Sequence, residues 1–555
     1  MSTTAADASD PQAAGQRTTL VIAASSLGTI FEWYDFYLYG LLATILSVQF
    51  FSGVNETTGF ILALAAFAAG FAVRPFGAIV FGRIGDLVGR KNTFLVTMGI
   101  MGLSTFAVGL LPSYATAGVL APVLLVTLRL LQGLALGGQY GGAAIYVAEH
   151  APDDKRGFFT SWIQTTATLG LFAALILVIV TRTLMGEIAF IDWGWRIPFL
   201  LSIVLLLISL WIRLRLNESP VYQKMKAEGA TSKAPLTEAF ANWPNARLVL
   251  IALFGAVIGQ AVVWYTSQFY ALFFLEKVMR VDGATANIMI AIALVIGTPF
   301  FLFFGWLSDR IGRKKIILVG CLLAAVAYFP LFHSLAQAVN PALYAAQARA
   351  PVAVIADPAD CSVQFDPIGK TQFDRKSCDI AKSLLAKAGV GYANEAASAG
   401  RAAQLRIGGT LIDVPDPRVA SDLPFSDSVE TFQNMARAEL STSGYPDKAD
   451  PAQINWPVAI GILTLFVIFV TMVYGPIAAL LVELFPARIR YTSMSLPYHI
   501  GNGWFGGFLP TIAFAIVAAT GNIYSGLWYP VIFAALTVVV GTLLLPETRG
   551  RRIDA

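Results

Sequence analysis

The chain has 555 residues, of which 56% are hydrophobic and 13% are charged, and its mean hydropathy is +0.67. This composition excludes an ordinary soluble globular protein, in which about a quarter of the residues are charged. The formal net charge of +4 comes from Lys and Arg in polar segments between apolar runs, so it predicts no nucleic-acid partner.

Apolar runs long enough to cross a bilayer as helices follow one another along the chain. The small, polar residues 1–17 are predicted to form a disordered cytoplasmic tail, and 546–555 a second one. A polar stretch over 214–245 separates six runs from six, and it predicts a cytoplasmic loop between two six-helix bundles. The twelve predicted spans are 20–48, 59–81, 93–112, 118–147, 158–181, 196–213, 247–275, 286–307, 315–336, 455–482, 492–519 and 523–545.

One basic turn occurs twice. Gly-Arg-Ile-Gly-Asp-Leu-Val-Gly-Arg-Lys-Asn at 82–92 returns as Gly-Trp-Leu-Ser-Asp-Arg-Ile-Gly-Arg-Lys-Lys at 305–315, at an offset of 223 residues. The segment 149–156 shares Glu, Pro and Arg with 483–490 at an offset of 334. A duplication inside an apolar chain indicates a membrane protein of two homologous halves. The growth of the offset predicts an insertion of about 110 residues in the second half.

The insertion is expected over 339–455, where Asp, Pro, Ser and Lys replace the apolar runs. Helices are predicted over 379–390 and 428–440, with a strand pair or an extended segment over 403–414, which favours a small folded domain; a loose loop is the alternative. Cys361 and Cys378 lie in this segment. The expected units are the N-terminal bundle 18–213, the central loop 214–245, helices 7–9 at 246–338, the insertion 339–455 and helices 10–12 at 456–545.

The positions of Lys and Arg predict the orientation in the membrane. With both termini in the cytoplasm, the basic turns at 82–92 and 305–315 also face the cytoplasm, as does the central loop. The insertion, between helices 9 and 10, is then extracytoplasmic. An exterior compartment is oxidising, so we expect a disulfide between Cys361 and Cys378. The predicted location is the inner or plasma membrane, and the insertion could bind an extracytoplasmic partner.

The duplicated turn resembles the signature loop of the major facilitator superfamily, which follows helix 2 and recurs after helix 8. Four further segments, 28–40, 74–77, 137–142 and 193–199, resemble the metabolite:proton symporter group of that superfamily, as does 483–492. The resemblance covers about 1–335 and 455–555. It implies an all-α membrane protein, with two six-helix bundles around a central cavity. It also implies a transporter, not an enzyme, that takes up small carboxylates or zwitterions with protons.

In this family the duplicated loop is structural and gating. Asp86 and Arg90 are four residues apart, so they can pair with each other and with neighbouring helix ends. We interpret the charges as a latch that closes the cytoplasmic gate in one state; charge that only fixes orientation is compatible with this. The gating set is Gly82, Asp86, Gly89, Arg90, Lys91, Glu149, Arg156, Gly305, Asp309, Gly312, Arg313, Glu483 and Arg490.

Charges inside membrane spans are few and costly, so they predict the coupling site. Glu32 and Asp35 share one face of helix 1, with Tyr39 one turn further on. Arg129 opens Arg-Leu-Leu-Gln-Gly, which resembles the helix 4 motif linked to proton coupling. We expect Arg129 to pair with Asp35, and protonation of Asp35 to release the arginine. Glu32 is the alternative coupling acid, and both carboxylates could instead be static partners of arginines.

Polar and aromatic side chains on several spans predict the substrate cavity. Arg74 precedes a proline in helix 2 and is expected to bind a substrate anion or to form a fixed salt bridge. His499 could shuttle protons or be a satisfied hydrogen-bonding group. The predicted substrate-binding set is Arg129, Arg74, Tyr39, Gln132, Trp162, Gln164, Gln260, Trp264, Tyr265, Gln268, Tyr498 and Asn502.

The sequence contains no phosphate-cradling Gly-Lys-Ser/Thr loop and no Cys/His cluster, so we expect no metal or other cofactor and no ATP-driven transport. The predicted function is import of a small organic acid by proton symport, with rocker-switch alternating access in the bilayer. Three alternatives are open. They are a symporter of a zwitterion such as proline or betaine, a proton antiporter, and a transporter-like sensor that uses the insertion.

Overall fold

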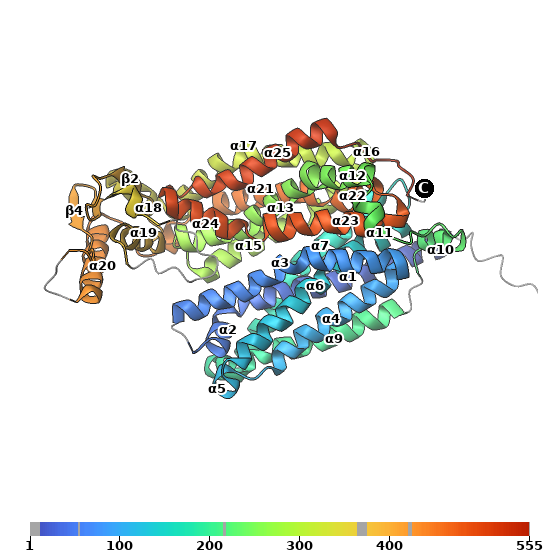
Figure 1. Ribbon diagram of the computed structural model, residues 1–555, viewed down its shortest axis with the longest axis horizontal. Helices are drawn as coiled ribbons and strands as arrows, with labels where there is room; N and C mark the ends of the chain where they lie inside the picture. The colour runs from blue at the N-terminus through green and yellow to red at the C-terminus, as the bar shows by residue number, and fades with distance from the viewer. Residues whose placement is uncertain (1–10, 54–55, 215–217, 363–374, 420–423, 554–555) are drawn as a thin grey trace, which may run out of the picture.

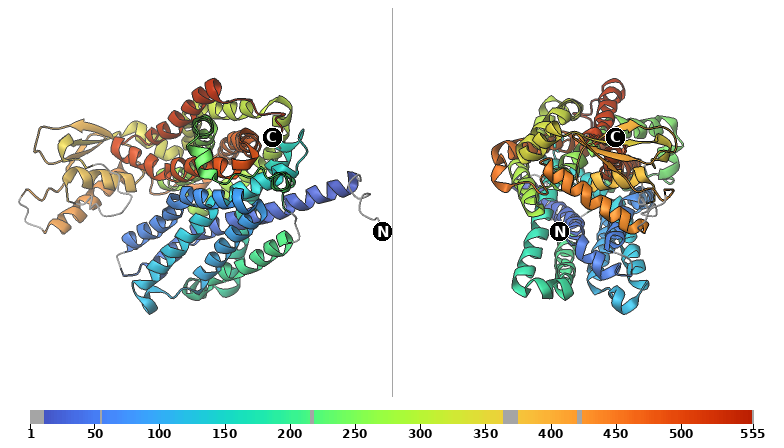
Figure 2. Two further views of the ribbon diagram at one scale, coloured as in Figure 1. Left: turned by 45° about the vertical axis from the view of Figure 1, so that its right-hand side comes forward. Right: turned by 90° about the vertical axis from the view of Figure 1, so that its left-hand side faces the viewer.

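The protein is described by a computed structural model over residues 11–53, 56–214, 218–362, 375–419 and 424–553. Two layers of long helices run side by side, the first half of the chain below the second in Figure 1. The start of α1 and the C-terminal segment lie at one end, and a small α/β domain projects from the other (Figure 2). We call the first the ion-pair end, after Glu149, Arg156, Glu483 and Arg490, and the second the insertion end.

Within the described residues, the first half contains six long helices, with short helical segments between some of them. Most residues of these helices are apolar, and the helical hydrogen bonds satisfy the backbone where no water is available. The long helices are α1 (Pro11–Leu41), α3 (Glu56–Val88), α4 (Arg90–Leu110), α6 (Leu120–His150), α7 (Arg156–Met185) and α9 (Arg196–Leu214). The short ones are α2 (Ala43–Phe50), α5 (Tyr114–Ala117), α8 (Glu187–Ala189) and η1 (Phe190–Gly194).

In the described part of the second half there are six more long helical segments, several of them interrupted. Trp243–Val278 comprises α12 (Trp243–Ala252), η2 (Leu253–Val257), α13 (Ile258–Tyr265), η3 (Thr266–Tyr270), α14 (Ala271–Phe273) and η4 (Phe274–Val278), the η segments here being π-helical. The next two segments are α15 (Gly283–Gly297) with α16 (Pro299–Ile311), and α17 (Arg313–Val339). After the insertion, one segment comprises α21 (Trp456–Tyr474) and α22 (Ile477–Leu484), and another comprises η7 (Ala487–Ile489), α23 (Arg490–His499), η8 (Ile500–Gly506) and α24 (Leu509–Thr520). The last comprises η9 (Ser525–Leu527) and α25 (Trp528–Leu544).

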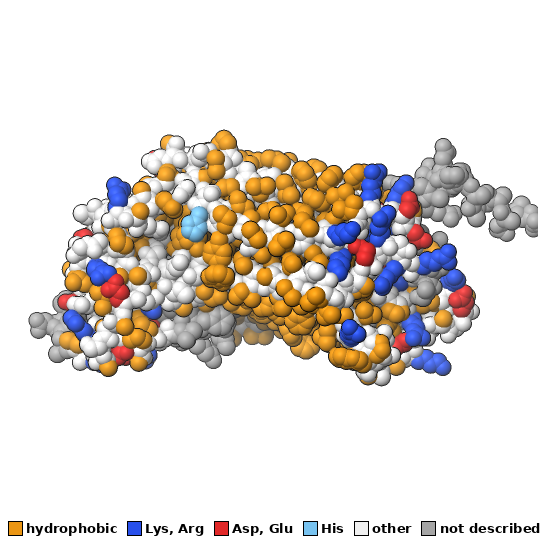
Figure 3. All heavy atoms as spheres, turned by 90° about the horizontal axis from the view of Figure 1, so that it is seen from above, with side chains coloured by type: hydrophobic (Ala, Val, Ile, Leu, Met, Phe, Trp, Pro, Cys, Tyr) orange, Lys and Arg blue, Asp and Glu red, His pale blue; other side chains and the backbone are white. Residues whose placement is uncertain are grey.

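Ten of these segments, in the part of the chain that the structure describes, are long and apolar enough to cross a membrane. With α1 and α3, twelve long helical segments are present, which is the number expected from the sequence. An apolar belt covers the middle of the face seen in Figure 3, and the charged side chains gather toward its two ends. This distribution is the one that a bilayer-spanning protein requires.

Two segments predicted to be polar tail and loop contain helix in the structure. Helix α1 begins at Pro11, so the disordered tail predicted over 1–17 ends too late; residues 1–10 lie outside the described part. Proline at the first helical position and the following Gln and Ala favour this earlier start. The central loop is also partly helical, since it contains α10 (Pro220–Ala227) and α11 (Pro235–Phe240).

The insertion between α17 and α21 is a folded α/β domain. Its four strands are ordered β2-β1-β3-β4, with β1 parallel to β2 and antiparallel to β3. Helix α19 begins where the sequence predicts a helix, and α20 and the β3–β4 hairpin also match. The elements are α18 (Pro341–Arg349), β1 (Val352–Ala356), η5 (Pro358–Asp360), α19 (Ser377–Lys387), β2 (Ala393–Ala396), β3 (Gln404–Ile407), β4 (Thr410–Asp413), α20 (Phe425–Thr442) and η6 (Pro451–Gln453). Cys361 and Cys378 form a disulfide within it.

Candidate functional site: a buried acid, a central polar cluster and an ion-pair gate

Asp35 on α1 lies at the centre of a buried hydrogen-bond network inside the first half. Its carboxylate accepts from Arg129 Nη1 at 3.1 Å, from Gln132 Nε2 at 3.0 Å and from Thr105 Oγ1 at 2.9 Å. Asp35 is 2% exposed and Arg129 5%. The structure thus places Arg129 beside Asp35, as the pairing hypothesis expects, while the coupling role itself stays a prediction. Thr105, from α4, is a partner that sequence reasoning missed.

Tyr39 belongs to this network and not to the boundary between the halves. The guanidinium carbon of Arg129 lies 4.0 Å from the centre of the Tyr39 ring, a cation–π geometry. The Tyr39 hydroxyl donates to the Ala63 carbonyl at 2.9 Å. A cation held by a carboxylate on one side and an aromatic face on the other is well compensated for its burial. Arg129 Nη1 also donates to Gln132 Oε1 at 2.5 Å, so loss of the carboxylate charge would leave the guanidinium with Gln132 and the Tyr39 ring among its partners.

A second polar cluster lies where the two halves meet. Glu32 and Arg74 come from the first half, and His499 comes from α23 of the second. Glu32 Oε2, Arg74 Nε and both ring nitrogens of His499 are buried and have no hydrogen-bond partner in the described part of the chain. Arg74 lies within electrostatic range of Glu32 and of His499, yet no ion pair joins it to Glu32 among the described residues. Buried polar groups are rarely left without partners, and such groups indicate a site for water or a ligand.

Aromatic side chains from both halves surround this cluster. The ring centres of Trp33 and Trp264 lie 5.1 Å apart, and those of Tyr140 and Tyr498 lie 3.7 Å apart in a stack. The Trp264 indole N–H is buried without a partner among the described residues. Further hydrogen bonds are Gln164 Nε2 to Tyr140 Oη at 2.8 Å, Tyr474 Oη to Tyr498 Oη at 2.6 Å, and the reciprocal amide pair of Gln260 and Asn502 at 3.2 and 3.1 Å. Aromatic walls with a few polar groups are typical of a small-ligand site.

At the ion-pair end, two carboxylate–guanidinium pairs cross between the halves. Glu149 accepts from Arg490 at 2.7 Å, and Glu483 accepts from Arg156 at 2.9 Å. Arg313 also donates to Glu483, at 3.1 Å, but from the same half. The two carboxylate groups and the three guanidinium groups are at most 1% exposed. The pairs are therefore desolvated and hold the halves together at this end.

The duplicated turns add a second kind of contact between the halves. Asp86 pairs with Arg90 at 3.2 Å and accepts from the backbone N–H groups of Tyr491 and Thr492, which begin α23 in the other half. Its repeat, Asp309, pairs with Arg313 at 2.7 Å and accepts from the N–H groups of Gly157 and Phe158 at the start of α7, both at 2.8 Å. Each aspartate thus supplies negative charge to the N-terminus of a helix across the interface.

Two family models match this chain. One, described as "Sugar (and other) transporter", matches residues 20–239 and 440–555, and the other, "MFS/sugar transport protein", matches 141–356. The chain belongs to the major facilitator superfamily. It is a multi-pass membrane transporter and not an enzyme. Residues 357–439, most of the insertion, lie outside both matches.

Two curated relatives are similar over the same fraction of the chain. The shikimate transporter of Escherichia coli K12 is 38% identical over 317 residues, 56% of this chain and 71% of that protein. The proline/betaine transporter of the same strain is 37% identical over 321 residues, 56% of this chain but only 63% of that protein. A solved structure of the proton:xylose symporter XylE has the same fold, with a TM-score of 0.63, 15% identity and coverage of 97% and 98% of the two chains.

Four residues that contribute to the contacts at the ion-pair end of this facilitator were missed by sequence reasoning. Glu218 accepts from the Lys91 N–H at 3.1 Å and Glu547 from the Arg313 N–H at 2.9 Å, so each caps the helix that follows a duplicated turn. The neighbouring hydroxyls donate to the crossing carboxylates, Ser219 to Glu149 and Thr548 to Glu483. Leu-Asn-Glu-Ser at 216–219 and Leu-Pro-Glu-Thr at 545–548 follow the sixth helix of each half, and this weak repeat is the signal that could have found them.

The glycines of the facilitator's duplicated turns have two different structural roles. Gly89 and Gly312 adopt φ of +125° and +107°, a region that side chains disfavour, and a Cβ on Gly312 would meet the Glu547 carboxylate. Gly82 and Gly305 instead allow close approach across the interface. A Cβ on Gly82 would lie 3.0 Å from Thr492 Cα, and one on Gly305 would lie 2.8 Å from the Gly157 carbonyl. Lys91 donates its side chain to the Leu214 carbonyl at 3.2 Å.

Not every predicted cavity residue lies with the central cluster. Trp162 is 38% exposed and packs edge-on against Phe158, so the structure does not bring it to the cluster. Gln132 and Tyr39 belong to the Asp35 network. Gln268 accepts from Tyr37 at 3.4 Å, and the ring centres of Tyr265 and Phe71 lie 6.1 Å apart, so both predicted residues lie at the boundary between the halves.

Proposed function

We propose that this transporter imports a small carboxylate-bearing solute together with protons, with Asp35 as the coupling acid. Protonation of Asp35 removes the negative charge that attracts Arg129. The Arg129 side chain can then change its partners, and this change links proton binding to the conformation of the first half. The buried Asp35–Arg129 pair is the observation that carries the proposal. Glu32 is the second candidate for the coupling acid, since it is 8% exposed and lies at the interface.

A zwitterion is the substrate class that the central cluster supports best. Arg74 and Glu32 carry opposite charges at one site and do not pair, so a solute with both a carboxylate and a cationic nitrogen complements both. Trp33 and Trp264 supply aromatic faces, which attract a quaternary or secondary ammonium group. The proline/betaine transporters among the relatives are consistent with this class. An organic acid, expected from the sequence, is the second candidate, and Arg74 together with the shikimate relative favours it.

Transport proceeds in this proposal by rocking of the two halves. In this proposal, the crossing pairs close the central cluster on the side of the ion-pair end in the state that the structure describes. The Lys and Arg distribution favours a cytoplasmic ion-pair end and an extracytoplasmic insertion. Protease digestion of sealed, right-side-out vesicles tests the orientation, because only an exterior insertion is cleaved there.

The coupling proposal is tested by Asp35→Asn, with Asp192→Asn in η1 as the matched exposed control. In proteoliposomes, Asp35→Asn should abolish accumulation driven by a pH gradient but keep exchange of labelled for unlabelled solute. Asp192→Asn should behave as wild type. If Asp35→Asn still accumulates solute like wild type, Asp35 is not the coupling acid. Repeating the assay with Glu32→Gln decides whether Glu32 has that role.

The voltage dependence of uptake separates the two substrate classes. A proton moved with a neutral zwitterion carries one charge, worth about 2.3 kcal/mol per 100 mV, or roughly 40- to 50-fold accumulation at that potential. A proton moved with a monoanion carries none. Proline, betaine and shikimate are the first solutes to compare, at fixed pH with the potential set by a potassium gradient and valinomycin. Uptake that responds only to pH would favour the organic acid.

A further inference from the structure

The inserted domain grips the second half of the transporter at two separate places. The first is the turn that follows η4. Asn340 Nδ2 donates to the Met279 carbonyl at 2.9 Å, and the Ala449 N–H donates to the Arg280 carbonyl at 3.0 Å. The Arg280 guanidinium in turn donates to the Ala388 and Pro446 carbonyls, which follow α19 and α20 of the insertion. Arg280 is the one non-glycine residue with positive φ, +56°, among those described.

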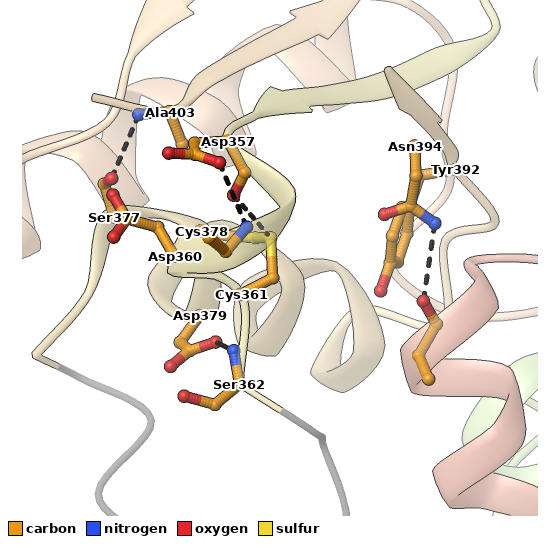
Figure 4. Close-up of a disulfide and its surroundings, with 12 residues drawn as sticks. Asp357, Asp360, Cys361, Ser362, Ser377, Cys378, Asp379, Tyr392, Asn394 and Ala403 are labelled. Atoms are coloured by element: carbon orange, nitrogen blue, oxygen red, sulfur yellow. Dashed lines mark hydrogen bonds between the residues drawn. A yellow bond between two sulfur atoms is a disulfide. The ribbon is translucent and has the colours of Figure 1, made fainter. Parts of the chain in front are cut away.

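The second grip is on the end of α24. The Tyr392 N–H donates to the Gly521 carbonyl at 2.8 Å, and its hydroxyl donates to the Ala518 carbonyl. Asn394 Nδ2 donates to the Thr520 carbonyl at 2.8 Å (Figure 4). Carbonyls at a helix C-terminus have no partners within the helix, so the insertion caps α24 from outside.

These two anchored elements also carry the second-half side of the central cluster. The segment 243–278 contains Gln260 and Trp264, and the chain from α23 to α24 contains His499 and Asn502. The Gln260–Asn502 amide pair joins them near the middle of the bundle. Both elements contain π-helical turns, η2 to η4 in the first and η8 in the second. Such turns weaken the regular helical ladder and mark places where a helix can change shape.

The disulfide stabilises the part of the insertion that forms the first grip. Cys378 is in the first turn of α19, and Cys361 follows η5, so the bond fixes the start of α19 to the end of the β1 segment (Figure 4). The other end of α19 leads to Ala388 and Gly389. Gly389 has φ +59°, and a Cβ there would lie 2.6 Å from the Lys277 carbonyl, so the backbone of α19 and of the transporter are in close contact.

We propose that the insertion is a rigid clamp that couples the insertion ends of segment 243–278 and of α24, and that the Cys361–Cys378 bond keeps it rigid. The clamp holds the outer parts of both interrupted helices at a fixed separation, so bending at their π-helical turns must occur together. In terms of the proposed function, it makes the insertion travel with the second half during the transport cycle. The contacts themselves do not depend on which solute is carried.

Hydrogen–deuterium exchange of the purified full chain tests the clamp without a transport assay. Arg280→Ala removes part of the first grip, and Asn394→Ala removes part of the second; Arg349→Ala, an exposed arginine of the insertion, is the matched control. A rigid clamp predicts that each variant speeds exchange at both anchors, over 279–285 and 518–524, by about 10-fold or more at the mutated one. Arg349→Ala should leave both segments unchanged.

Independent surface loops would respond differently. If Arg280→Ala changes exchange only over 279–285, or nowhere, the two anchors are not coupled and the proposal is wrong. Replacing Cys361 and Cys378 together by serine should speed exchange over 385–395 and at both anchors, while exchange in α4 and α9 of the first half stays as in wild type. An effect confined to the insertion would remove the disulfide from the clamp. If Arg280→Ala does not fold, Arg280→Lys provides a milder variant, because it retains the positive charge but not the planar guanidinium group that reaches both carbonyls.

Discussion

Glu483→Gln should open the transporter at the ion-pair end. Glu483 accepts from Arg156 across the interface at 2.9 Å and from Arg313 within its own half at 3.1 Å. The Arg313 contact is present whether the halves are together or apart, so it cancels from the conformational equilibrium. Only the Arg156 contact is lost on opening. A hydrogen bond to a charged group contributes about 1.5–3 kcal/mol, so its weakening shifts the open population by up to about 10- to 150-fold.

Cysteine accessibility measures this shift. Ser495 on α23 is fully buried, and a Cβ on Gly141 of α6, in the other half, would meet its hydroxyl. In a Cys321→Ala background, Ser495→Cys should react slowly with N-ethylmaleimide, and Glu483→Gln should speed that reaction until the open form dominates. Asp153→Asn is the control. Asp153 also pairs with Arg156, but its side chain is 72% exposed and it lies in the same half as Arg156, so this pair does not hold the halves together. Equal labelling rates in Glu483→Gln and Asp153→Asn would refute the role of the crossing pair.

Three further predictions follow from close approaches and from one titrating group. Gly157→Ala should also speed labelling of the cysteine at 495, because its Cβ would lie 2.6 Å from the Gly305 carbonyl of the other half, whereas Gly461→Ala, which meets nothing within 4 Å, should not. Gly137→Ala should lower the melting temperature, since its Cβ would lie 2.6 Å from the Gly77 carbonyl carbon, and Gly99→Ala, in open space within α4, should not. The Arg418 side chain lowers the pKa of Asp416 in the insertion to about 2. The ionised Asp416 carboxylate therefore stabilises the folded insertion above about pH 4, and this stabilisation is lost as the pH falls toward 2. Limited proteolysis of the insertion should detect the loss as faster cleavage. In Asp416→Asn this contribution to the pH dependence should be absent.

The duplicated turn made many of the contacts at the ion-pair end predictable. A motif that recurs at one offset places Asp86 and Asp309 at equivalent positions of two halves, and a four-residue spacing on a helix brings Asp to Arg. The same logic reached Asp35 and Arg129, because charges that are rare within apolar spans must pair or line a cavity. These arguments need only local geometry and the high cost of burying a charge.

Other features depend on contacts that local patterns do not encode. Glu32 and Arg74 are as rare within spans as Asp35 and Arg129, yet no ion pair joins them among the described residues, and only the relative position of α1 and α3 decides this. Trp162 is of a residue type that often lines ligand cavities, but it lies on the exposed side of α7. The insertion was recognisable as a folded unit, whereas its grip on Gly521 joins residues more than 120 positions apart and left no signal in either segment.

The ion-pair end combines two kinds of interaction, and they respond differently to sequence change. Glu149 and Glu483 bind guanidinium groups, so loss of Arg490 leaves the buried Glu149 carboxylate without this cation, whereas loss of Arg156 leaves Glu483 with Arg313. Asp86 and Asp309 bind backbone N–H groups at the starts of α23 and α7, which every residue except proline provides. When the halves part, these helix N-termini lose their anions while Asp86 and Asp309 keep Arg90 and Arg313. Opening therefore costs less at Asp86, Asp309 and Glu483, each of which keeps an arginine of its own half, than at Glu149, whose pairing with Arg490 crosses between the halves.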